Sequence, residues 1–305
     1  MRLQPLARAK LASLGAEGVA WAADLPERLV SLERQWSLTL GRALPGGSAS
    51  YVVRARTRSG AEVVVKVGLP GSGLAAQAAT LSRAAGQGYA RLLAADLERG
   101  ALLLEALGPS LQSSALTVED QLQVLAETLA VAWQPLPAPP EVKVVNKAAQ
   151  LHALVSRLWQ EQDRPCPERV VEQALGYADR RRAVPGGESV VVHGDPHPGN
   201  LLQAQGGRTV GAGTGWCFVD PDGFVADRAY DLGVVLRDWS HRLTDGGGRS
   251  RLERWCLLLA EHSGVDAGRI WEWGYLERVS TGLYLRSFGA DRAAAPFLRT
   301  AELLL

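Results

Sequence analysis

Hydrophobic and polar positions in the first third of the chain fall into short alternating or β-branched runs, which is typical of β-strands. Two turn sequences, Arg58-Ser-Gly60 and Arg99-Gly100, each separate a pair of these runs. Helices are predicted over 25–35, with Pro26 at the first turn, and over the alanine-rich 74–85. The predicted strands are residues 36–44, 51–57, 61–67, 91–98 and 101–104. The pattern predicts a small lobe of antiparallel sheet with one helix, preceded by another helix.

The rest of the chain is predicted to be mainly helical. Residues 105–109 break the pattern and are interpreted as a linker, so that the predicted lobes are 1–105 and 106–305. Thr117 to Asp120 resembles a capping box before a long apolar-periodic run. One short strand, 189–192, interrupts the helices. The remaining predicted helices lie at about 144–160, at 167–182, at 230–242 and in the last 55 or so residues. The expected class is α+β.

Composition changes this picture little. The 305 residues include 33 Lys+Arg and 32 Asp+Glu, a net charge of +1 that favours neither nucleic acid nor an anionic membrane as partner. Residues 1–105 carry 13 basic and 8 acidic side chains, and the remainder 20 and 24, which suits a nucleotide in the first lobe and a cationic substrate in the second. Three widely spaced cysteines and the lack of an apolar leader predict a cytoplasmic protein. A monomer or weak dimer is expected.

The stretch His193-Gly-Asp-Pro-His-Pro-Gly-Asn200 carries the candidate chemistry. Its prolines and glycines exclude a helix, so a rigid loop presents Asp195 and Asn200, and a second short loop adds Asp220. Phosphoryl transfer needs a carboxylate that accepts a hydroxyl proton and oxygen ligands for Mg²⁺. The spacing D-x-x-x-x-N is that of kinase catalytic loops. Asp195 is therefore the candidate base, and Asn200 and Asp220 are the candidate Mg²⁺ ligands.

Other residues of the two loops have supporting parts. Asp222 is interpreted first as a cap of the turn at Gly223 and second as a further ligand. A metallohydrolase built on His193 and His197 is the rival interpretation, but the helix that would align the two rings is excluded by the prolines. We expect His193 to brace the loop by hydrogen bonding and His197 to lie near the metal or a phosphate.

Three further groups complete the candidate site. Lys66 shares a strand face with Val64, from which it would meet the nucleotide phosphates, and Ser48 lies in a Gly-Ser loop that would close over them. Asp227 or Asp231, at the start of a predicted helix, is expected to bond back to the His193 loop. Carboxylates interleaved with tryptophans in the C-terminal part suit a cationic, sugar-like substrate, although amphipathic helices alone also explain them. The candidates among these are Asp238, Glu272 and Trp271.

With these residues placed, the sequence resembles the aminoglycoside phosphotransferase family, of protein-kinase-like fold, and in particular its streptomycin and hydroxyurea resistance kinases. The segments that carry the resemblance are HGDPHPGNLL and FVDPDGFVADRAYDLG. The resemblance implies a two-lobed fold, ATP with GTP as the alternative donor, Mg²⁺, and a hinge at Glu105, Ala106 and Leu107 that bonds the base. It also implies an aminoglycoside acceptor, foremost the 6-hydroxyl of streptomycin.

The sequence departs from the family pattern at two places. Pro196 stands where these kinases usually have leucine. The helix after Lys66 lacks the glutamate that usually pairs with the strand lysine, and Gln77 is the nearest substitute. Two alternatives stay open: a kinase of another acceptor (another aminoglycoside, hydroxyurea, a sugar or an amino alcohol) and a nucleotide-binding pseudokinase.

Overall fold

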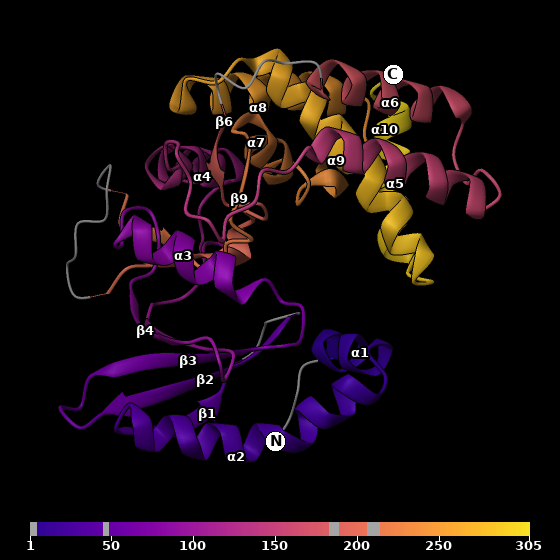
Figure 1. Cartoon of the computed structure of the whole chain (residues 1–305). Helices are drawn as coiled ribbons and strands as arrows, with labels where there is room; N and C mark the ends of the chain where they lie inside the picture. The colour runs from indigo at the N-terminus through magenta and orange to yellow at the C-terminus, as the bar shows by residue number, and fades with distance from the viewer. Residues whose placement is uncertain (1–4, 45–48, 183–188, 206–213) are drawn as a thin grey trace.

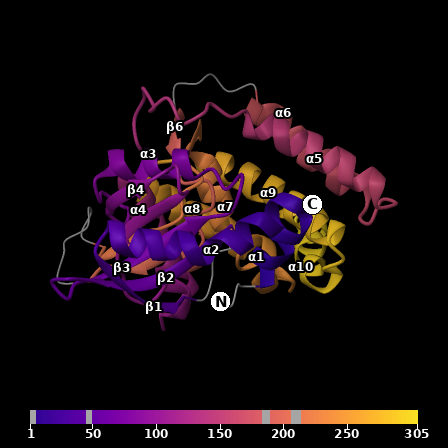
Figure 2. The same cartoon turned by 60° about the horizontal axis from the view of Figure 1, so that its bottom comes forward.

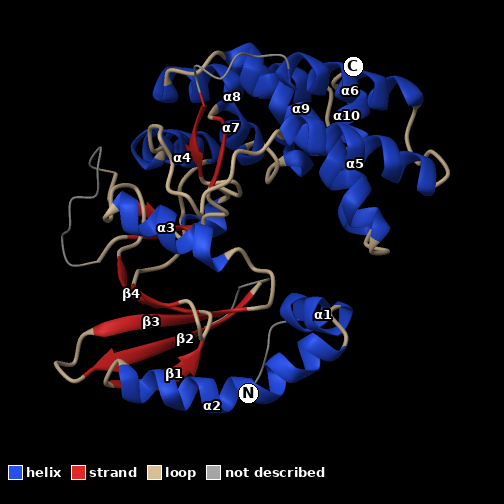
Figure 3. Ribbon diagram, in the orientation of Figure 1, coloured by secondary structure: helices blue, strands red, loops and turns tan. Residues whose placement is uncertain are grey.

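The structure is a computed structural model that describes residues 5–44, 49–182, 189–205 and 214–305. It has two lobes, one built on a sheet and one mainly helical, so the α+β prediction is confirmed (Figures 1 and 3). No described helix is long and apolar enough to cross a membrane.

The first lobe is a five-stranded antiparallel sheet in the order β1-β2-β3-β5-β4. Its strands are β1 (Leu38–Ala43), β2 (Ser50–Thr57), β3 (Glu62–Gly68), β4 (Leu92–Asp96) and β5 (Ala101–Glu105). Alternation along β3 sends Val63, Val65 and Val67 into one core, which the helix over residues 16–35 covers, and turns Val64 and Lys66 to the other face. The sheet therefore offers one face to the helices that precede it in the chain, and the other to the helix that follows β3 and to the second lobe.

Three helices belong to this lobe: α1 (Pro5–Ser13), α2 (Ala16–Gln35) and α3 (Leu74–Ala84). The predicted beginning of the helix over 25–35 is wrong, because α2 starts nine residues earlier, at Ala16, and contains Pro26 in its interior. A buried stripe of Trp21, Leu25, Leu29 and Leu32 continues across it. Packing of this stripe on the sheet outweighs the hydrogen bond that the proline removes. In Figures 1 and 2, α2 runs along the sheet on the side away from the helical lobe.

The second lobe contains seven α-helices and two short antiparallel pairs among its described residues. The helices are α4 (Val118–Ala132), α5 (Lys147–Glu161), α6 (Glu168–Arg182), α7 (Ala229–Val235), α8 (Gly248–Ser263), α9 (Ala267–Ser287) and α10 (Asp291–Leu303). The pairs are β6 (Ser189–Val192) with β9 (Phe224–Asp227), and β7 (Leu201–Gln203) with β8 (Trp216–Phe218). Helices α5 and α6 pack along one another and form one side of the lobe (Figure 2).

The start of α4 and the end of α7 can be compared with the boundaries that the sequence predicts. The capping box is confirmed, since the Thr117 hydroxyl accepts the Asp120 N–H at 3.1 Å and the Asp120 carboxylate accepts the Thr117 N–H. The helix predicted over 230–242 is wrong, because α7 ends at Val235 and a separate 3₁₀ turn covers Ser240–Leu243. The buried Arg278 guanidinium donates to the Leu236 carbonyl at 3.2 Å and replaces the lost helical donor there.

Candidate active site

The loop after β6 is fixed by a buried carboxylate of α7. Asp231 accepts the backbone N–H groups of His193 and Gly194 at 2.8 and 2.9 Å, and the Trp133 indole N–H at 2.9 Å. Burial raises the pKa of Asp231 to about 6, although these three bonds act to lower it. Asp231 therefore makes the contact that the sequence assigned to Asp227 or Asp231.

Gly194 permits the close approach of the two loops. Its φ is +94°, and a Cβ there would lie 2.7 Å from the Cβ of Asp222 and from the Phe224 ring. The Asp222 N–H donates to the His193 carbonyl at 2.8 Å. Because β6 and β9 pair directly beside this point, the two loops emerge from one edge and face the same space.

His193 braces both loops, as expected from the sequence. Its Nδ1 accepts the Asp195 N–H at 3.1 Å, and its Nε2–H donates to the Val219 carbonyl at 2.9 Å. The ring also stacks on Tyr89, with centroids 5.9 Å apart. Burial lowers the pKa of His193 to about 4, so the ring is neutral near pH 7. With both ring nitrogens engaged, His193 has none left for a metal.

Asp195 lies in a network of charges. One carboxylate oxygen accepts from Arg237, and the other is 3.8 Å from the His197 Nε2. Burial acts to raise the pKa of Asp195, but the Arg237 charge and His197 outweigh it, so the pKa lies below its usual value. Arg237 is held in turn by the buried Glu277 at 3.6 Å. The Asp195 carboxylate is thus ionised and oriented.

The neighbours of Asp195 include two other predicted residues. Asn200 donates its side-chain N–H to the Asp195 carbonyl at 3.1 Å, which leaves its amide oxygen for another partner. The Asp238 carboxylate lies 4.0 Å from the His197 Nδ1, so this candidate does join the site. Burial raises the pKa of Asp238. The nearby His197 and Arg237 charges act to lower it but do not outweigh the effect of burial.

Lys66 joins the two lobes. Its ammonium donates to the Gln77 side-chain oxygen at 2.7 Å and to Asp220 Oδ1 at 2.9 Å. Gln77 also donates to the Pro221 carbonyl at 3.3 Å, so α3 holds the lysine and the Asp220 loop together. Asp220 itself has a φ of +58°, a strained conformation for a residue other than glycine. The predicted pairing of Lys66 with Gln77 is confirmed in its geometry.

A cavity of about 340 Å³ lies between the lobes. At one end it is lined by Lys66, Asn200 and Asp220, and at the other by Glu105 and Leu107. Ala106 is buried between these last two. Leu44, Val52, Val64, Leu104, Leu202 and Val219 give the cavity apolar walls. The predicted Ser48 lies outside the described residues. This cavity suits a flat base with a charged tail.

The donor set at the charged end fits Mg²⁺. The Asn200 amide oxygen and the Asp220 carboxylate are hard oxygen donors on one wall of one cavity, and Mg²⁺ takes its other ligands from phosphates and water. Across residues 5–44, 49–182, 189–205 and 214–305, no three His, Cys, Asp or Glu side chains form a metal-binding group.

The other two acceptor candidates lie elsewhere. Glu272 is paired with Arg180 and Arg181 of α6, at 2.7 Å each, so its charge is already compensated. The Trp271 indole lies 3.2 Å from the Tyr177 hydroxyl, also on α6. The structure does not bring these two residues to Asp195: this face of α9 packs against α6, and the face that carries Glu277 turns toward Asp195.

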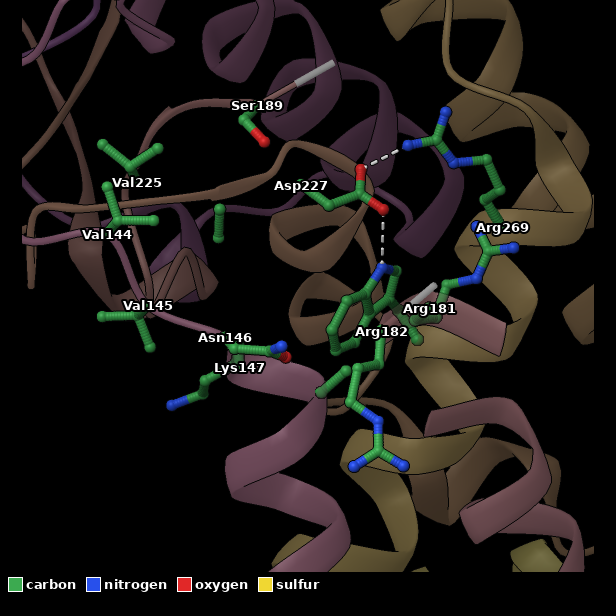
Figure 4. A pocket seen from close by; sticks show the side chains of 13 residues that line it. Val144, Val145, Asn146, Lys147, Arg181, Arg182, Ser189, Val225, Asp227 and Arg269 are labelled. Carbon is green, nitrogen blue, oxygen red and sulfur yellow. Dashed lines mark hydrogen bonds and ion pairs between the residues drawn. The ribbon is translucent and has the colours of Figure 1, made fainter. Parts of the chain in front are cut away.

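Asp227 is part of a second cavity, of about 220 Å³, which Figure 4 shows. Its carboxylate accepts from Arg269 at 2.6 Å and from the Trp273 indole at 3.0 Å. It holds α9 to the β6–β9 pair and does not touch the His193 loop in any contact of the described residues.

Arg237 and Glu277 belong to the charge network around Asp195 but are not among the residues predicted from the sequence. Arg237 follows the buried residues 232–236 just beyond the end of α7, and a charge at the end of such a buried run was the available signal. Its partners lie 42 and 40 residues away on either side, which no local pattern connects.

The two lobes, the lysine of the sheet and the loop carboxylates define a protein of protein-kinase-like fold. Solved structures agree: a choline/ethanolamine kinase family protein of Mesorhizobium loti matches with a TM-score of 0.61 and 16% identity, over 93% of this chain and 95% of its own. The aminoglycoside phosphotransferase APH(3'')-Id of Streptomyces rimosus, in complex with ADP and streptomycin, matches with a TM-score of 0.54 and 18% identity, over 84% and 98%.

The sequence itself places the chain more narrowly. Residues 35–289 match the model of the aminoglycoside/hydroxyurea antibiotic resistance kinase family, and the chain belongs to this family. The streptomycin 6-kinase of Streptomyces griseus is 27% identical over 98% of this chain and 95% of its own length. The chain is accordingly a phosphotransferase that acts on hydroxyl groups.

Proposed function

We propose that the chain transfers the γ-phosphoryl group of ATP to a hydroxyl of an aminoglycoside, foremost the 6-hydroxyl of streptomycin, with Mg²⁺ as cofactor. The observation that carries this proposal is the convergence of Lys66, Asn200 and Asp220 on one cavity. Asp195 lies beside this cavity, where its backbone carbonyl accepts a hydrogen bond from Asn200. The similarity to the streptomycin 6-kinase of Streptomyces griseus supports the choice of acceptor.

In this proposal residues 1–105 supply most of the nucleotide site. The base lies between the apolar walls, with its edge toward the backbone of Glu105 to Leu107. The Lys66 ammonium binds the phosphates at the opposite end, and Gln77 and Asp220 fix its position. Residues 106–305 supply the catalytic loop and the acceptor pocket.

Asp195 receives the proton of the acceptor hydroxyl. Because the Arg237 charge keeps its pKa low, the carboxylate is ionised and orients the hydroxyl before transfer. Asn200 and Asp220 would hold Mg²⁺, which offsets the negative charge of the phosphates when it is bound. His193 and Asp231 keep the loop in place.

The acceptor's cationic groups face a surface with several carboxylates. Asp195, Asp238 and Glu277 are linked through Arg237 and His197, and Asp222 lies beside them. Burial, and the nearby Asp195 charge, raise the pKa of Asp222. A bound cation would relieve this repulsion among carboxylates, which favours a basic acceptor.

A coupled assay of ADP release tests the proposal. We expect Mg²⁺-dependent release with streptomycin, and a much smaller rate with kanamycin, hydroxyurea or ethanolamine. Asp195→Asn provides the negative control, and Asp245→Asn, on the exposed surface, the matched one. Release that is no faster with any aminoglycoside than without acceptor would contradict the proposal, and ADP binding without turnover would point to a pseudokinase.

A further inference from the structure

Arg54 is a second cation in the cavity between the lobes, at the end opposite the catalytic residues. Among the described residues that line this cavity, only Arg54 and Lys66 carry positive charge. The register of the sheet separates them: Val52 lies opposite Lys66, and Arg54 opposite Val64, which in turn is opposite Leu104. Two residues along a strand correspond to about 7 Å. Arg54 is thus displaced from the phosphate end toward Leu107.

The guanidinium of Arg54 is held over the Leu107 backbone. Its Nη1 donates to Glu62 at 2.6 Å, and its Nη2 donates to the Leu107 carbonyl at 3.4 Å. Its Nε is buried and has no partner among the described residues. The side chain is 30% exposed. The ion pair with Glu62 therefore holds the Arg54 guanidinium beside the Leu107 carbonyl.

The backbone N–H and the backbone carbonyl of Leu107 differ in whether they already have a hydrogen-bond partner. Its N–H donates to no acceptor within the described part of the chain, whereas its carbonyl already accepts from Arg54. A ligand edge that needs a donor is therefore satisfied here, whereas an edge that needs an acceptor meets the Arg54 N–H groups beside the carbonyl and competes with them for its oxygen.

Adenine and guanine differ in this respect. Adenine offers the acceptor N1 beside C2–H, which needs no hydrogen bond. Guanine offers N1–H and the 2-amino group, which are both donors and require an acceptor. A buried donor that meets another donor loses the hydrogen bond that it made in water and gains none in its place.

We propose that Arg54 is a specificity residue that selects adenine over guanine by covering the Leu107 carbonyl. The proposal rests on the function proposed above only in placing a purine nucleotide in this cavity. Arg54 acts against the 2-amino group of the base and takes no part in phosphoryl transfer.

Nucleotides that differ at one position isolate this effect. Calorimetry should compare ADP with 2-amino-ADP, which adds only the 2-amino group, and GDP with IDP, which lacks it. We expect wild type to bind ADP at least about tenfold more tightly than 2-amino-ADP, and IDP more tightly than GDP, because each pair differs by one unpaired donor. These measurements need no acceptor and no turnover, so they stand even where streptomycin is not phosphorylated.

Arg54→Met removes the donors and keeps the apolar stem. We expect it to reduce the ADP preference over 2-amino-ADP to within about threefold, since the Leu107 carbonyl becomes free to accept. Arg56→Met is the matched control: Arg56 lies on the same strand and contacts the same Glu62, at 3.5 Å, but is 70% exposed and does not line the cavity. This control should keep the wild-type ratio.

Equal affinity of wild type for ADP and 2-amino-ADP would overturn the proposal. An unchanged ratio in Arg54→Met, or an equal loss of discrimination in Arg56→Met, would do so too. Tighter binding of GDP than ADP by wild type, lost in Arg54→Met, would also overturn it, since Arg54 would then bind guanine O6 and N7. Failure of every purine nucleotide to bind would overturn the proposed function together with this inference.

Discussion

The two charged centres of the site, Asp195 in the helical lobe and Lys66 in the sheet, are held in different ways. Asp195 has its own counter-ion, Arg237, which the buried Glu277 holds from behind. Lys66 has a neutral partner in its own lobe, Gln77, and finds its counter-charge across the cleft in Asp220. The ion pairs of Asp195 form within the helical lobe alone, whereas the ion pair between Lys66 and Asp220 forms only when the two lobes are in contact.

This difference assigns separate consequences to the two centres. Loss of a partner of Asp195 leaves uncompensated charge inside the helical lobe and should affect both folding and catalysis. Loss of a partner of Lys66 changes how the lobes and the nucleotide come together, so it should appear mainly in nucleotide affinity. The following predictions separate these outcomes.

Asp195→Asn should have the largest effect. The amide cannot accept the hydroxyl proton, so kcat should fall by about 10²–10⁴-fold while ADP affinity stays near that of wild type. Stopped-flow or quench-flow rates and ADP calorimetry measure the two quantities. A variant that keeps its turnover would remove Asp195 from the role of base.

Arg237→Met should reduce activity and stability together. Without the Arg237 charge, burial dominates and the Asp195 pKa rises, so the acid limb of kcat/KM moves to higher pH. The unpaired Glu277 should cost about 1–3 kcal/mol of unfolding free energy, less than for a fully buried pair because Arg237 is 21% exposed. Urea denaturation and pH–rate profiles measure both effects.

The double variant Arg237→Met/Glu277→Met separates the two consequences. It should recover much of the stability, since the buried Glu277 carboxylate is no longer left without its partner, but the acid limb should stay displaced. Arg242→Met, on the exposed 3₁₀ turn, is the matched control and should resemble wild type. Recovery of the acid limb in the double variant would show that Arg237 does not act through its charge on Asp195.

Asp231→Asn should change how stability depends on pH. Burial raises the Asp231 pKa from 3.8 to about 6, so the folded protein binds this proton more tightly than the unfolded chain does. Its contribution to stability is therefore lost as pH rises from about 4 to about 6. His193, whose pKa is lowered from 6.5 to about 4, contributes in the opposite direction, because stability is gained as pH rises through that range.

The variant keeps the His193 contribution and loses that of Asp231. The unfolding free energy of Asp231→Asn minus that of wild type should therefore rise by about 2–3 kcal/mol between pH 4 and pH 6. Urea denaturation over this pH range measures it. A difference that is constant with pH would mean that Asp231 stays ionised when folded.

Gln77→Glu should have the smallest effect. The new carboxylate supplies Lys66 with a charge in its own lobe, but the hydrogen bond from Gln77 to the Pro221 carbonyl is lost. We expect ATP affinity to rise by no more than about threefold, with kcat nearly unchanged. Gln77→Met, which removes both bonds, should weaken ATP binding. Identical ATP affinities in all three proteins would show that Gln77 does not position Lys66.

Much of the site could be predicted because its residues are close in sequence. The prolines and glycines of the His193 loop dictate its shape locally, and alternation along β3 fixes the direction of Lys66. The pairing of Lys66 with Gln77 also follows from a strand and the helix that comes next.

The errors concern helices whose faces are not defined by their sequence. Every residue from Trp273 to Val279 is buried, so the pattern on α9 does not say that Glu272 faces α6 or that Glu277 faces Arg237. Pro26 looked like a helix start because the stripe that carries α2 across it becomes apparent only against the sheet. Both depend on packing between distant segments, which one sequence does not reveal.

Phosphorus NMR of the product tests the central claim most directly. Wild type, ATP, Mg²⁺ and streptomycin should yield one phosphate monoester, on the 6-hydroxyl, and the same mixture with Asp195→Asn should yield none on the same timescale. Phosphorylation at the same rate in that variant, or the absence of any streptomycin phosphate with wild type that binds ATP, would contradict the account.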